Sequence, residues 1–476
     1  MESMQYGTRK GSMIVMTLVF TAVFAALVTS LAGFVLTQKK AHVAKENREK
    51  AVQIAEAGLD FYKWYLAHYP NDLNGPTNTL PYVANYDDPE GPAFGAYSIT
   101  TSGTSTCGVV SAIDITSTGY TNEKPDFKRT LTARYARPSV AEYAFILNSN
   151  VWVGEDKDVI GPYHSNGGIR MDGPNQSIVT SAENTWLCTG SFGCSGSQTR
   201  PGIFGASPGS ALWEFPIPNI DFAGISVDLT AMKTRAQASG LYFATISGRN
   251  PRYGYHMILK PNRTVDVYRV TNSEQIWSDT VEDDWTQRYE RITAQTLLGN
   301  YAIPPNCGLI FAEDRIWLEG TTTGKVTVAA AHVSSGTYAP DILITGNLAY
   351  ASSTGHGLTA IAENNIYIPL VVPNDLSMRG IFIAQGGQFG RNNYTEDGDE
   401  DVPSTYDSYV KRNSLTLYGT IVSNGREGTK WVSGNTFISG FNDRYNSYDR
   451  DLALDPPPLT PYTSDDYTFI EWHEQN

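Results

Sequence analysis

Positive charge is in short supply in this sequence. Of its 476 residues only 35 are Lys or Arg, against 49 Asp or Glu, and the net charge is −14. Binding of a phosphate backbone depends on clustered Lys and Arg that displace counterions. A balance this acidic leaves no basic surface of the required size, so we expect no nucleic-acid partner.

Cysteine is also scarce. There are four residues and no CxxC pair, which argues against zinc sites and thioredoxin-type chemistry. Cys188 and Cys194 bracket a short loop and are a disulfide candidate if the chain is exported to an oxidising compartment. Buried free thiols are the alternative, and the pairing of Cys107 and Cys307 stays open.

The residues that are abundant favour β-structure. Gly, Tyr, Thr, Ser and Asn are frequent while charged residues make up only 18%, a composition that suits short strands joined by tight turns. The length exceeds one ordinary domain, so we expect two or three units. The sequence predicts a mainly β fold with a β-rich head.

One long hydrophobic run lies near the amino end. Residues 13–36 carry no charge and no proline, and as a helix of about 1.5 Å rise per residue they span about 36 Å, enough to cross a bilayer. The run is longer than the core of a cleaved signal peptide, so we expect it to remain in the mature protein. The helix continues with one apolar face and ends at Pro70. That face comprises Ala41, Ala44, Val52, Ala55, Leu59, Tyr62 and Leu66.

Residues 9–11 (RKG), the apolar run and residues 55–59 (AEAGL) resemble the start of PilX-type minor pilins and of K-type minor pseudopilins. The resemblance implies a minor subunit of a type IV pilus or related secretion filament, cut by prepilin peptidase between Gly11 and Ser12. It also implies other pilin subunits as partners, the inner membrane as the location before assembly, and a cell-surface filament afterwards.

Two positions depart from the pattern of major pilins. Those proteins carry Glu as the fifth mature residue, where this chain has Met16, and that carboxylate is thought to pair with the amino terminus of the neighbouring subunit. A subunit without it suits the filament tip, with a role in filament initiation, adhesion or surface contact. Where major pilins often have proline, this chain has Gly33, which predicts either local softening of the helix or close helix packing.

The charges that flank the run conflict with this topology. Several lysines follow it, from Lys39 to Lys50, whereas Arg9 and Lys10 precede it, so the positive-inside rule favours a cytoplasmic head. Large domains translocate largely regardless of flanking charge, and the resemblance places the leader inside. We therefore expect a single-pass protein with an extracytoplasmic head.

A short pattern recurs in the head. An apolar residue is followed by a polar turn and by a second apolar residue five positions later, which predicts two short strands hinged at an Asn, Asp or Gly corner. Repetition of such units predicts the coils of a parallel β-helix, with an antiparallel sandwich as the alternative. The starts are Phe311, Val326, Leu343, Ile361 and Ile383, with an earlier copy at Ile146.

These patterns divide the chain into segments. Between the two parts of the solenoid, a helix is expected over 220–238 and a hairpin over 253–270. The predicted segments are a leader (1–11), a pilin-like helix (12–70) with its transmembrane span (13–36), a β linker region (71–139), a first solenoid part (140–214), an inserted α/β module (215–303), the main solenoid (304–440) and a C-terminal cap (441–476).

An acidic loop is the one candidate for metal binding. Glu396, Asp397, Asp399, Glu400 and Asp401 supply hard oxygen ligands of the kind that bind Ca²⁺, although their spacing departs from that of an EF-hand. A solvated acidic loop is the alternative. Calcium is therefore a candidate ligand, and no other cofactor is expected.

No residue is assigned a catalytic role, and we expect no enzyme. His164 is not accompanied by a Gly-x-Ser-x-Gly elbow at a strand-to-helix junction, so a turn histidine bonded to backbone is favoured. The main rival hypothesis is a membrane-anchored β-helix protein that binds or acts on carbohydrate, which would need paired carboxylates or a basic residue on one face.

Aromatic residues at strand positions suggest adhesion as a further role. An aromatic strip on the surface could stack on sugars, so surface glycans are a candidate partner of the head. Half of these side chains are expected to belong to the core. The candidates are Trp152, Trp317, Tyr350 and Tyr367.

Overall fold

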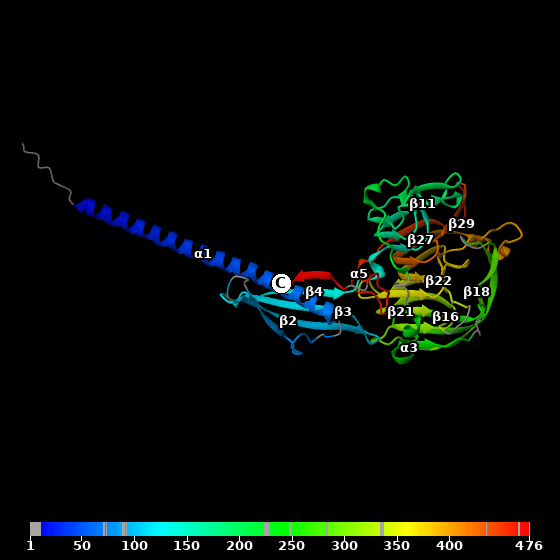
Figure 1. The fold of residues 1–476 in the computed structure, drawn as a ribbon, viewed down its shortest axis with the longest axis horizontal. Coiled ribbons are helices and arrows are strands. Elements are labelled where there is room, and N and C mark those ends of the chain that lie inside the picture. Colours follow the sequence, from blue (N-terminus) through cyan, green and yellow to red (C-terminus); the bar gives the residue numbers. More distant parts are fainter. Residues whose placement is uncertain are drawn as a thin grey trace, which may run out of the picture. The chain divides into compact units, whose positions relative to one another are not determined.

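The computed structural model describes residues 11–69, 72, 74–87, 91, 93–222, 228–246, 250–280, 284–333, 338–434, 436–464 and 467–475. It is mainly β, with 45% strand and 21% helix, and a long apolar helix precedes a β-rich head, which confirms the predicted fold class at this level. The chain divides into two compact units (Figure 1). The first comprises Met1–Ser102, Ile113–Tyr135 and Glu471–Asn476, and the second Gly103–Ala112 and Ala136–Ile470.

The first unit is a helix on a five-stranded sheet. The sheet order is β1-β2-β3-β4-β30, so the predicted linker region forms four of its strands and the end of the chain forms the fifth. In Figure 1 the helix runs along this sheet. The elements are α1 (Gly11–His68), β1 (Tyr82–Asp87), β2 (Ala93–Thr106), β3 (Val109–Thr121), β4 (Arg129–Ala136) and β30 (Thr468–Glu474).

Helix α1 packs on the sheet only through its second half. It ends at His68, two residues before Pro70, which cannot continue a helix. The predicted apolar face is largely correct, because Ala55, Leu59, Tyr62 and Leu66 are buried, although Ala41 is exposed. The buried face begins at Asn47, whose side-chain oxygen accepts a hydrogen bond from Thr121 Oγ1 at 2.6 Å.

The second unit consists of many short strands with a few helical turns. Its first elements are η1 (Val140–Glu142), β5 (Phe145–Leu147), β6 (Val151–Val153), β7 (Asp158–Ile160), β8 (Tyr163–Ser165), β9 (Ile169–Met171), β10 (Val179–Ser181), β11 (Thr185–Cys188), η2 (Gly190–Phe192), β12 (Gln198–Pro201), β13 (Ile203–Phe204), η3 (Ser210–Leu212) and β14 (Trp213–Glu214). The next are α3 (Leu229–Ser239), β15 (Leu241–Phe243), β16 (Gly254–Lys260), β17 (Thr264–Ser278), β18 (Thr286–Ala302), β19 (Leu309–Ala312), β20 (Ile316–Thr322), β21 (Lys325–Ala330) and β22 (Ile342–Tyr350). The last are β23 (Gly357–Ala362), β24 (Ile366–Tyr367), β25 (Asp375–Ala384), β26 (Phe389–Gly390), η4 (Ser404–Tyr406), α4 (Asp407–Val410), β27 (Lys411–Ser423), β28 (Lys430–Ser433), β29 (Thr436–Ser447) and α5 (Arg450–Leu454).

Parallel ladders organise this unit, and we call them the stack. One ladder runs β15-β19-β21-β23-β25-β27-β5-β8-β10-β14. A second runs β16-β20-β22-β24-β26. Alternate side chains of the two ladders meet in one apolar core, including Ile310, Ile316, Val328 and Ile342.

The register of the first ladder agrees in part with the predicted repeat. Phe311, Ile361 and Ile383 stack in one column, and Ile146 joins the same column two strands further on. Leu343 does not belong to it, because it lies on β22 in the second ladder and pairs with Trp317. The sequence pattern mixed two ladders, since both have the same alternation of apolar and polar residues.

The order of strands in the stack differs from their order in the chain. β5 pairs in parallel with β27, so in the first ladder the segment predicted as the first solenoid part follows the strands of the main one. Hydrogen bonds between asparagine side chains follow the same order of strands. Asn166 donates to Asn148 and Asn148 donates to Asn424, each at 2.8 Å. Asp156 forms ion pairs with Lys430 and Arg444 across the same junction.

The segment predicted as an inserted module is continuous with the stack. Its hairpin is confirmed, with Lys260 opposite Thr264 at the turn. However, β15 and β16 also pair with β19 and β20, so the structure gives no boundary at residue 303. Within the range predicted as a helix, α3 begins at Leu229, where Asp228 caps it by accepting from Ala231 N at 2.9 Å, and residues 223–227 lie outside the described residues.

The C-terminal segment was predicted to cap an end of the solenoid. In the structure it runs along the side of the stack. The Thr327 hydroxyl donates to Pro458 O, and the hydroxyls of Thr359 and Thr460 lie 2.8 Å apart. Its last strand, β30, then pairs with β4 in the first unit's sheet. The segment therefore covers the outer face of β21 and β23, where Leu452 is buried.

Candidate functional site

Among the described residues, no other element packs against the first half of α1, residues 13–36. Its large apolar side chains are all at least half exposed, and Met13 reaches 79%. The mean hydropathy of its most apolar window is 2.4, and none of that window is buried. By length and composition this helix is able to cross a membrane. We call residues 13–36 the apolar half and residues 44–68 the packed half.

The residues tied to pilin assembly lie in or before the apolar half. α1 begins at Gly11, and the leader of residues 1–10 lies outside the described residues. Met16 is 59% exposed. The helix continues through Gly33 without a break, and apart from the neighbouring helix backbone no described atom lies within 4 Å of the position that its Cβ would take. Cleavage before Ser12 and the roles of Met16 and Gly33 therefore stay predictions.

Glycine allows the packed half to approach the sheet closely. A Cβ on Gly119 of β3 would lie 2.3 Å from the Ala51 carbonyl oxygen of the helix, closer than any side chain tolerates. A Cβ on Gly58 would lie 2.3 Å from the Ser117 hydroxyl. Gly58, part of the AEAGL stretch, thus has a packing role within this chain.

All four cysteines are paired. Cys188 bonds to Cys194, the predicted candidate, and Cys107 bonds to Cys307, the pair that the sequence left open. The two bonds differ in the chain they enclose, with sequence separations of 6 and 200 residues. Disulfides form and persist in oxidising compartments.

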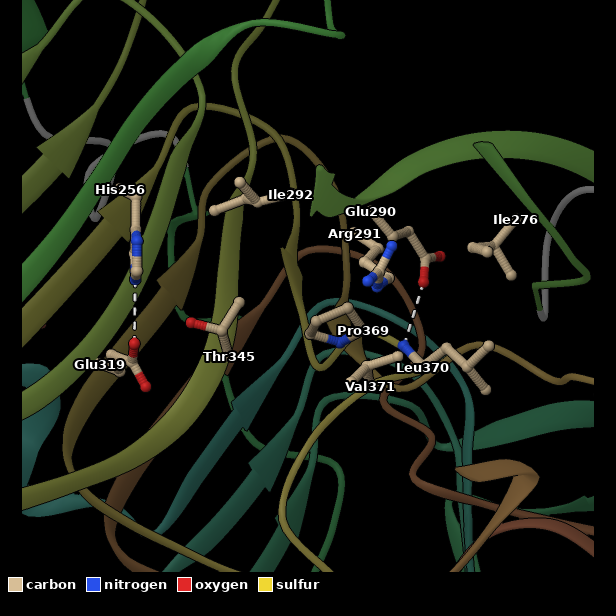
Figure 2. A pocket seen from close by; sticks show the side chains of 10 residues that line it. All are labelled: His256, Ile276, Glu290, Arg291, Ile292, Glu319, Thr345, Pro369, Leu370 and Val371. Atoms are coloured by element: carbon tan, nitrogen blue, oxygen red, sulfur yellow. Dashed lines mark hydrogen bonds and ion pairs between the residues drawn. The ribbon is translucent and has the colours of Figure 1, made fainter. Parts of the chain in front are cut away.

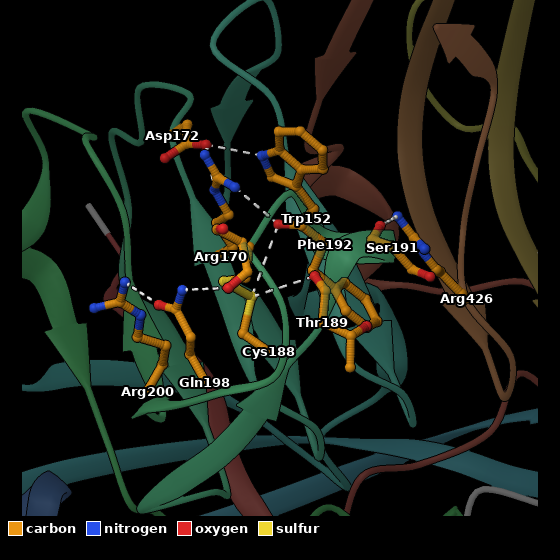
Figure 3. The surroundings of a disulfide bond; sticks show 12 residues. Trp152, Arg170, Asp172, Cys188, Thr189, Ser191, Phe192, Gln198, Arg200 and Arg426 are labelled. Atoms are coloured by element: carbon orange, nitrogen blue, oxygen red, sulfur yellow. Dashed lines mark hydrogen bonds and ion pairs between the residues drawn. A yellow bond between two sulfur atoms is a disulfide. The ribbon is translucent and has the colours of Figure 1, made fainter. Parts of the chain in front are cut away.

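The short disulfide loop is held by two arginines from other segments (Figure 3). Arg170 donates from Nη1 to Phe192 O at 2.8 Å, and Arg426 donates from Nη2 to Ser191 O at 3.1 Å. The Arg170 guanidinium also lies 4.4 Å from the centroid of the Trp152 ring. Trp152, 38% exposed, is thus fixed by an arginine on its face.

The acidic loop shows no assembled metal site. Glu396, Asp397, Asp399 and Asp401 are exposed and Glu400 is half-buried. Among the described residues, no three His, Cys, Asp or Glu side chains gather in a group that could hold a metal ion. Calcium binding stays a prediction without a geometric site.

His164 has structural partners, although not the backbone ones that were expected. Its two ring nitrogens lie 2.9 Å from Thr180 Oγ1 and from Asn166 Oδ1. The sequence analysis overlooked a Gly-x-Ser-x-Gly pattern at residues 205–209, in the loop after β13. Its Ser207 is buried and donates to Asn175 Oδ1 at 2.9 Å, so an amide takes the place that a catalytic base would need.

The four candidate aromatics do not form a surface strip. Trp317 is fully buried and Tyr350 and Tyr367 are half-buried, whereas Trp152 is partly exposed in a different ladder. One of the four is thus in the core, where two were expected. A continuous aromatic platform is not present among these four.

Two neighbouring cavities lie between the stack and a long hairpin, β17–β18, which we call the arm. The first cavity, of about 230 Å³, is lined by His256, Glu319 and Thr345 from three strands of the second ladder and by Glu290 and Ile292 of the arm (Figure 2). The second, of about 240 Å³, has a more polar lining and shares Glu290. Its other lining residues are Arg288, Tyr289, Arg315, Asp341, Leu343, Asn364, Asn365 and Tyr367.

Strand alternation explains why polar side chains gather here. On β16, β20 and β22 the apolar neighbours of His256, Glu319 and Thr345 point into the core, so these three face outward under the arm. Those neighbours are Tyr255, Met257, Leu318 and Ile344. Trp317, on the same face, fixes the arm by donating from its indole nitrogen to Glu290 O at 2.6 Å. The arm is thus attached to the stack at the residue that both cavities share.

The two carboxylates of the first cavity have opposite environments. Burial raises the pKa of Glu290, against hydrogen bonds from Leu370 N and the Tyr394 hydroxyl. The hydrogen bond from His256 Nε2, at 2.9 Å, lowers the pKa of Glu319. Opposite pKa shifts of two carboxyl groups are typical of a catalytic acid and base. Here, however, the Glu290 carboxylate already accepts hydrogen bonds from groups of the protein itself. The sequence analysis missed all of these residues, because they come from separate strands and share no motif.

Comparison with solved structures finds a likeness to a pilin. The crystal structure of the competence-associated pilin ComZ from Thermus thermophilus aligns with 90% of this chain and 97% of its own, at 15% identity and a TM-score of 0.29. That score is too low to support an argument about fold or function. No known family and no curated protein matches the sequence.

Proposed function

We propose that the chain is a pilin-like minor subunit of a type IV pilus or related secretion filament, inserted in the membrane before assembly. The observation that carries this proposal is the contrast within α1, where one uninterrupted helix has an exposed apolar half and a half packed on a sheet. An apolar helix of this length is stable in lipid or against similar helices. It therefore suits both a membrane-anchored and a filament-assembled state.

The mature amino terminus tests this proposal. Prepilin peptidase would cut between Gly11 and Ser12, so mass spectrometry of the protein from its native membrane should find Ser12 as the first residue, methylated. Gly11→Val should keep the leader, whereas the control Gly7→Val, inside the leader, should be processed normally. An intact Met1 in the unaltered protein would contradict the proposal.

We also propose that the head is extracytoplasmic. Both disulfides lie in the second unit, and they suit an oxidising compartment. This supports an exported head in spite of the lysines that follow the span. Protease added to intact spheroplasts should degrade the head, and a head that resists protease until the membrane is opened would reverse the assignment.

Met16 supports a position at the filament tip, with a role in initiation, adhesion or surface contact. A subunit with no carboxylate at this position has nothing to pair with a neighbour's amino terminus inside the apolar helix bundle. Immunogold against the head should label filament ends, and uniform labelling of the shaft would contradict a tip position.

A membrane-anchored protein that binds or acts on carbohydrate is the second candidate. The cavities under the arm favour it, because their walls combine apolar and polar groups. Such a protein would keep Met1, so the amino-terminal measurement separates the two candidates. The stacked parallel ladders support a parallel β-helix head in either case.

A further inference from the structure

The cavities under the arm have walls suited to an uncharged polyhydroxylated ring. Their charged side chains already have partners, since Arg315 pairs with Asp341 at 2.6 Å and His256 with Glu319 at 2.9 Å. Arg288 donates to Ser278, and Glu290 accepts from Leu370 N and the Tyr394 hydroxyl. Arg291, also at the first cavity, pairs with Glu274 at 3.1 Å. Walls whose charges are matched in this way recognise hydroxyl groups by hydrogen bonds and do not select a net charge.

The first cavity offers both kinds of surface that a sugar ring needs. Ile276, Ile292 and Val371 supply apolar contact for the C–H face of a ring. Thr345 Oγ1 is buried without a hydrogen-bond partner among the described residues. Figure 2 shows Thr345 between the His256–Glu319 pair and Pro369. A ligand hydroxyl would satisfy that unpartnered group.

The second cavity continues the same surface. Along β18, residues 288–290 line it and residues 290–292 line the first, so the two cavities follow each other along the arm. Asn364 and Asn365 both donate to Asp341 Oδ1 at 3.0 Å, which fixes two amides at its wall. Each volume is below the range of about 300–1,000 Å³ for drug-sized ligands, so each suits one ring.

We propose that the two cavities bind two successive rings of a neutral glycan, with Thr345 and Glu319 at one ring and Asn364 and Asn365 at the other. The proposal assigns a ligand class to the surface-contact role of the proposed function. It rests on the proposed function only for the location of the head, where the glycan would be encountered. Glu290 holds the shared wall through fixed donors, so the site binds its ligand and does not cleave it.

Saturation-transfer NMR on the full chain tests this, in micelles of lauryldimethylamine oxide because sugar-headed detergents would compete. Cellobiose, maltose and N,N′-diacetylchitobiose are the neutral probes, and a glucuronate-containing disaccharide is the acidic one. At least one neutral probe should bind, more tightly than the acidic probe and without hydrolysis. Thr345→Val should weaken that binding about 3- to 10-fold, the worth of one hydrogen bond.

Two further variants separate binding from folding. Val371→Trp fills the first cavity and should abolish binding, while Thr416→Val, an exposed threonine on β27 away from both cavities, should leave it unchanged. The proposal is overturned if no neutral probe binds, if the acidic probe binds as well, or if Val371→Trp binds like the unaltered chain. These outcomes do not depend on the amino-terminal mass, so either proposal can fail alone.

Discussion

The two halves of α1 differ in their surroundings, although they belong to one uninterrupted helix. The packed half buries Ile54, Leu59 and Tyr62 against a sheet, whereas the apolar half exposes every large side chain that it carries. In water the second arrangement is costly, since apolar surface favours burial by about 25 cal/mol per Å². The difference indicates that the packed half completes a protein core, whereas the apolar half has the surroundings that the proposed membrane and filament states would supply.

The largest expected effect comes from placing charges in the apolar half. Phe24→Arg combined with Leu27→Arg should weaken membrane insertion by about 5–7 kcal/mol, since each Arg at the centre of a span costs about 2.5–3.5 kcal/mol. The protein should shift to the soluble fraction while thermal unfolding of both units stays unchanged. Phe24→Leu with Leu27→Ile is the matched control. Retention of the arginine variant in the membrane would contradict the inferred difference between the two halves.

A cavity in the packed half should have the reverse effect. Ile54 is fully buried, so Ile54→Ala should lower the free energy of unfolding of the first unit by about 2–5 kcal/mol. Membrane partitioning should not change. Val19→Ala removes a similar side chain from the apolar half and serves as the control, for which chemical denaturation should show almost no loss. Equal losses from both variants would mean that the two halves have similar surroundings.

The two disulfides of the head enclose loops of very different length, so we expect their removal to differ in cost. Replacing Cys107 and Cys307 by serine should cost about 2–5 kcal/mol, the usual range for a native disulfide. Replacing Cys188 and Cys194 should cost less, because cross-links that close a longer loop restrict the unfolded chain more. Chemical denaturation of the two double variants gives the order, and the reverse order would contradict the loop-length argument.

The smallest expected effect is a dependence of head stability on pH through Glu290. Burial raises the pKa of this carboxyl in the folded chain above its unfolded value of about 4.3. A raised carboxyl pKa gives a contribution to stability that is fully present below the unfolded pKa and is lost as pH rises through the folded pKa. In denaturation experiments Glu290→Gln should therefore gain stability relative to the unaltered chain as the pH rises above the unfolded pKa of about 4.3. If the free energies of unfolding of the two proteins changed equally with pH, this prediction would be wrong.

Local patterns predicted part of the fold. The absence of charge and proline over 13–36 predicted the apolar half, and Pro70 predicted the end of α1 to within two residues. The turn at Lys260 predicted the hairpin, because such a connection is local in sequence. Leu343 was assigned to the wrong ladder, since a period of two defines two faces of a strand but does not identify its neighbours.

The cavities could not be predicted either, because the sequence does not show which strands are neighbours. His256, Glu290, Glu319 and Thr345 lie on four different strands, and only the pairing of those strands brings them together. The one available signal was a histidine and a glutamate at outward positions of otherwise apolar strands. That signal identifies polar side chains without indicating that an arm covers them.

The position of β5 after β27 has a consequence for how the head is made. Ribosomes deliver residues 145–147 well before residues 411–423, yet these two strands are neighbours in the ladder. A head exported from its amino end would therefore display one bare edge of β5 until the last quarter of the chain has emerged. Folding of this head cannot proceed strand by strand in the direction of synthesis, and it completes only when residues 421–423 pair with residues 145–147.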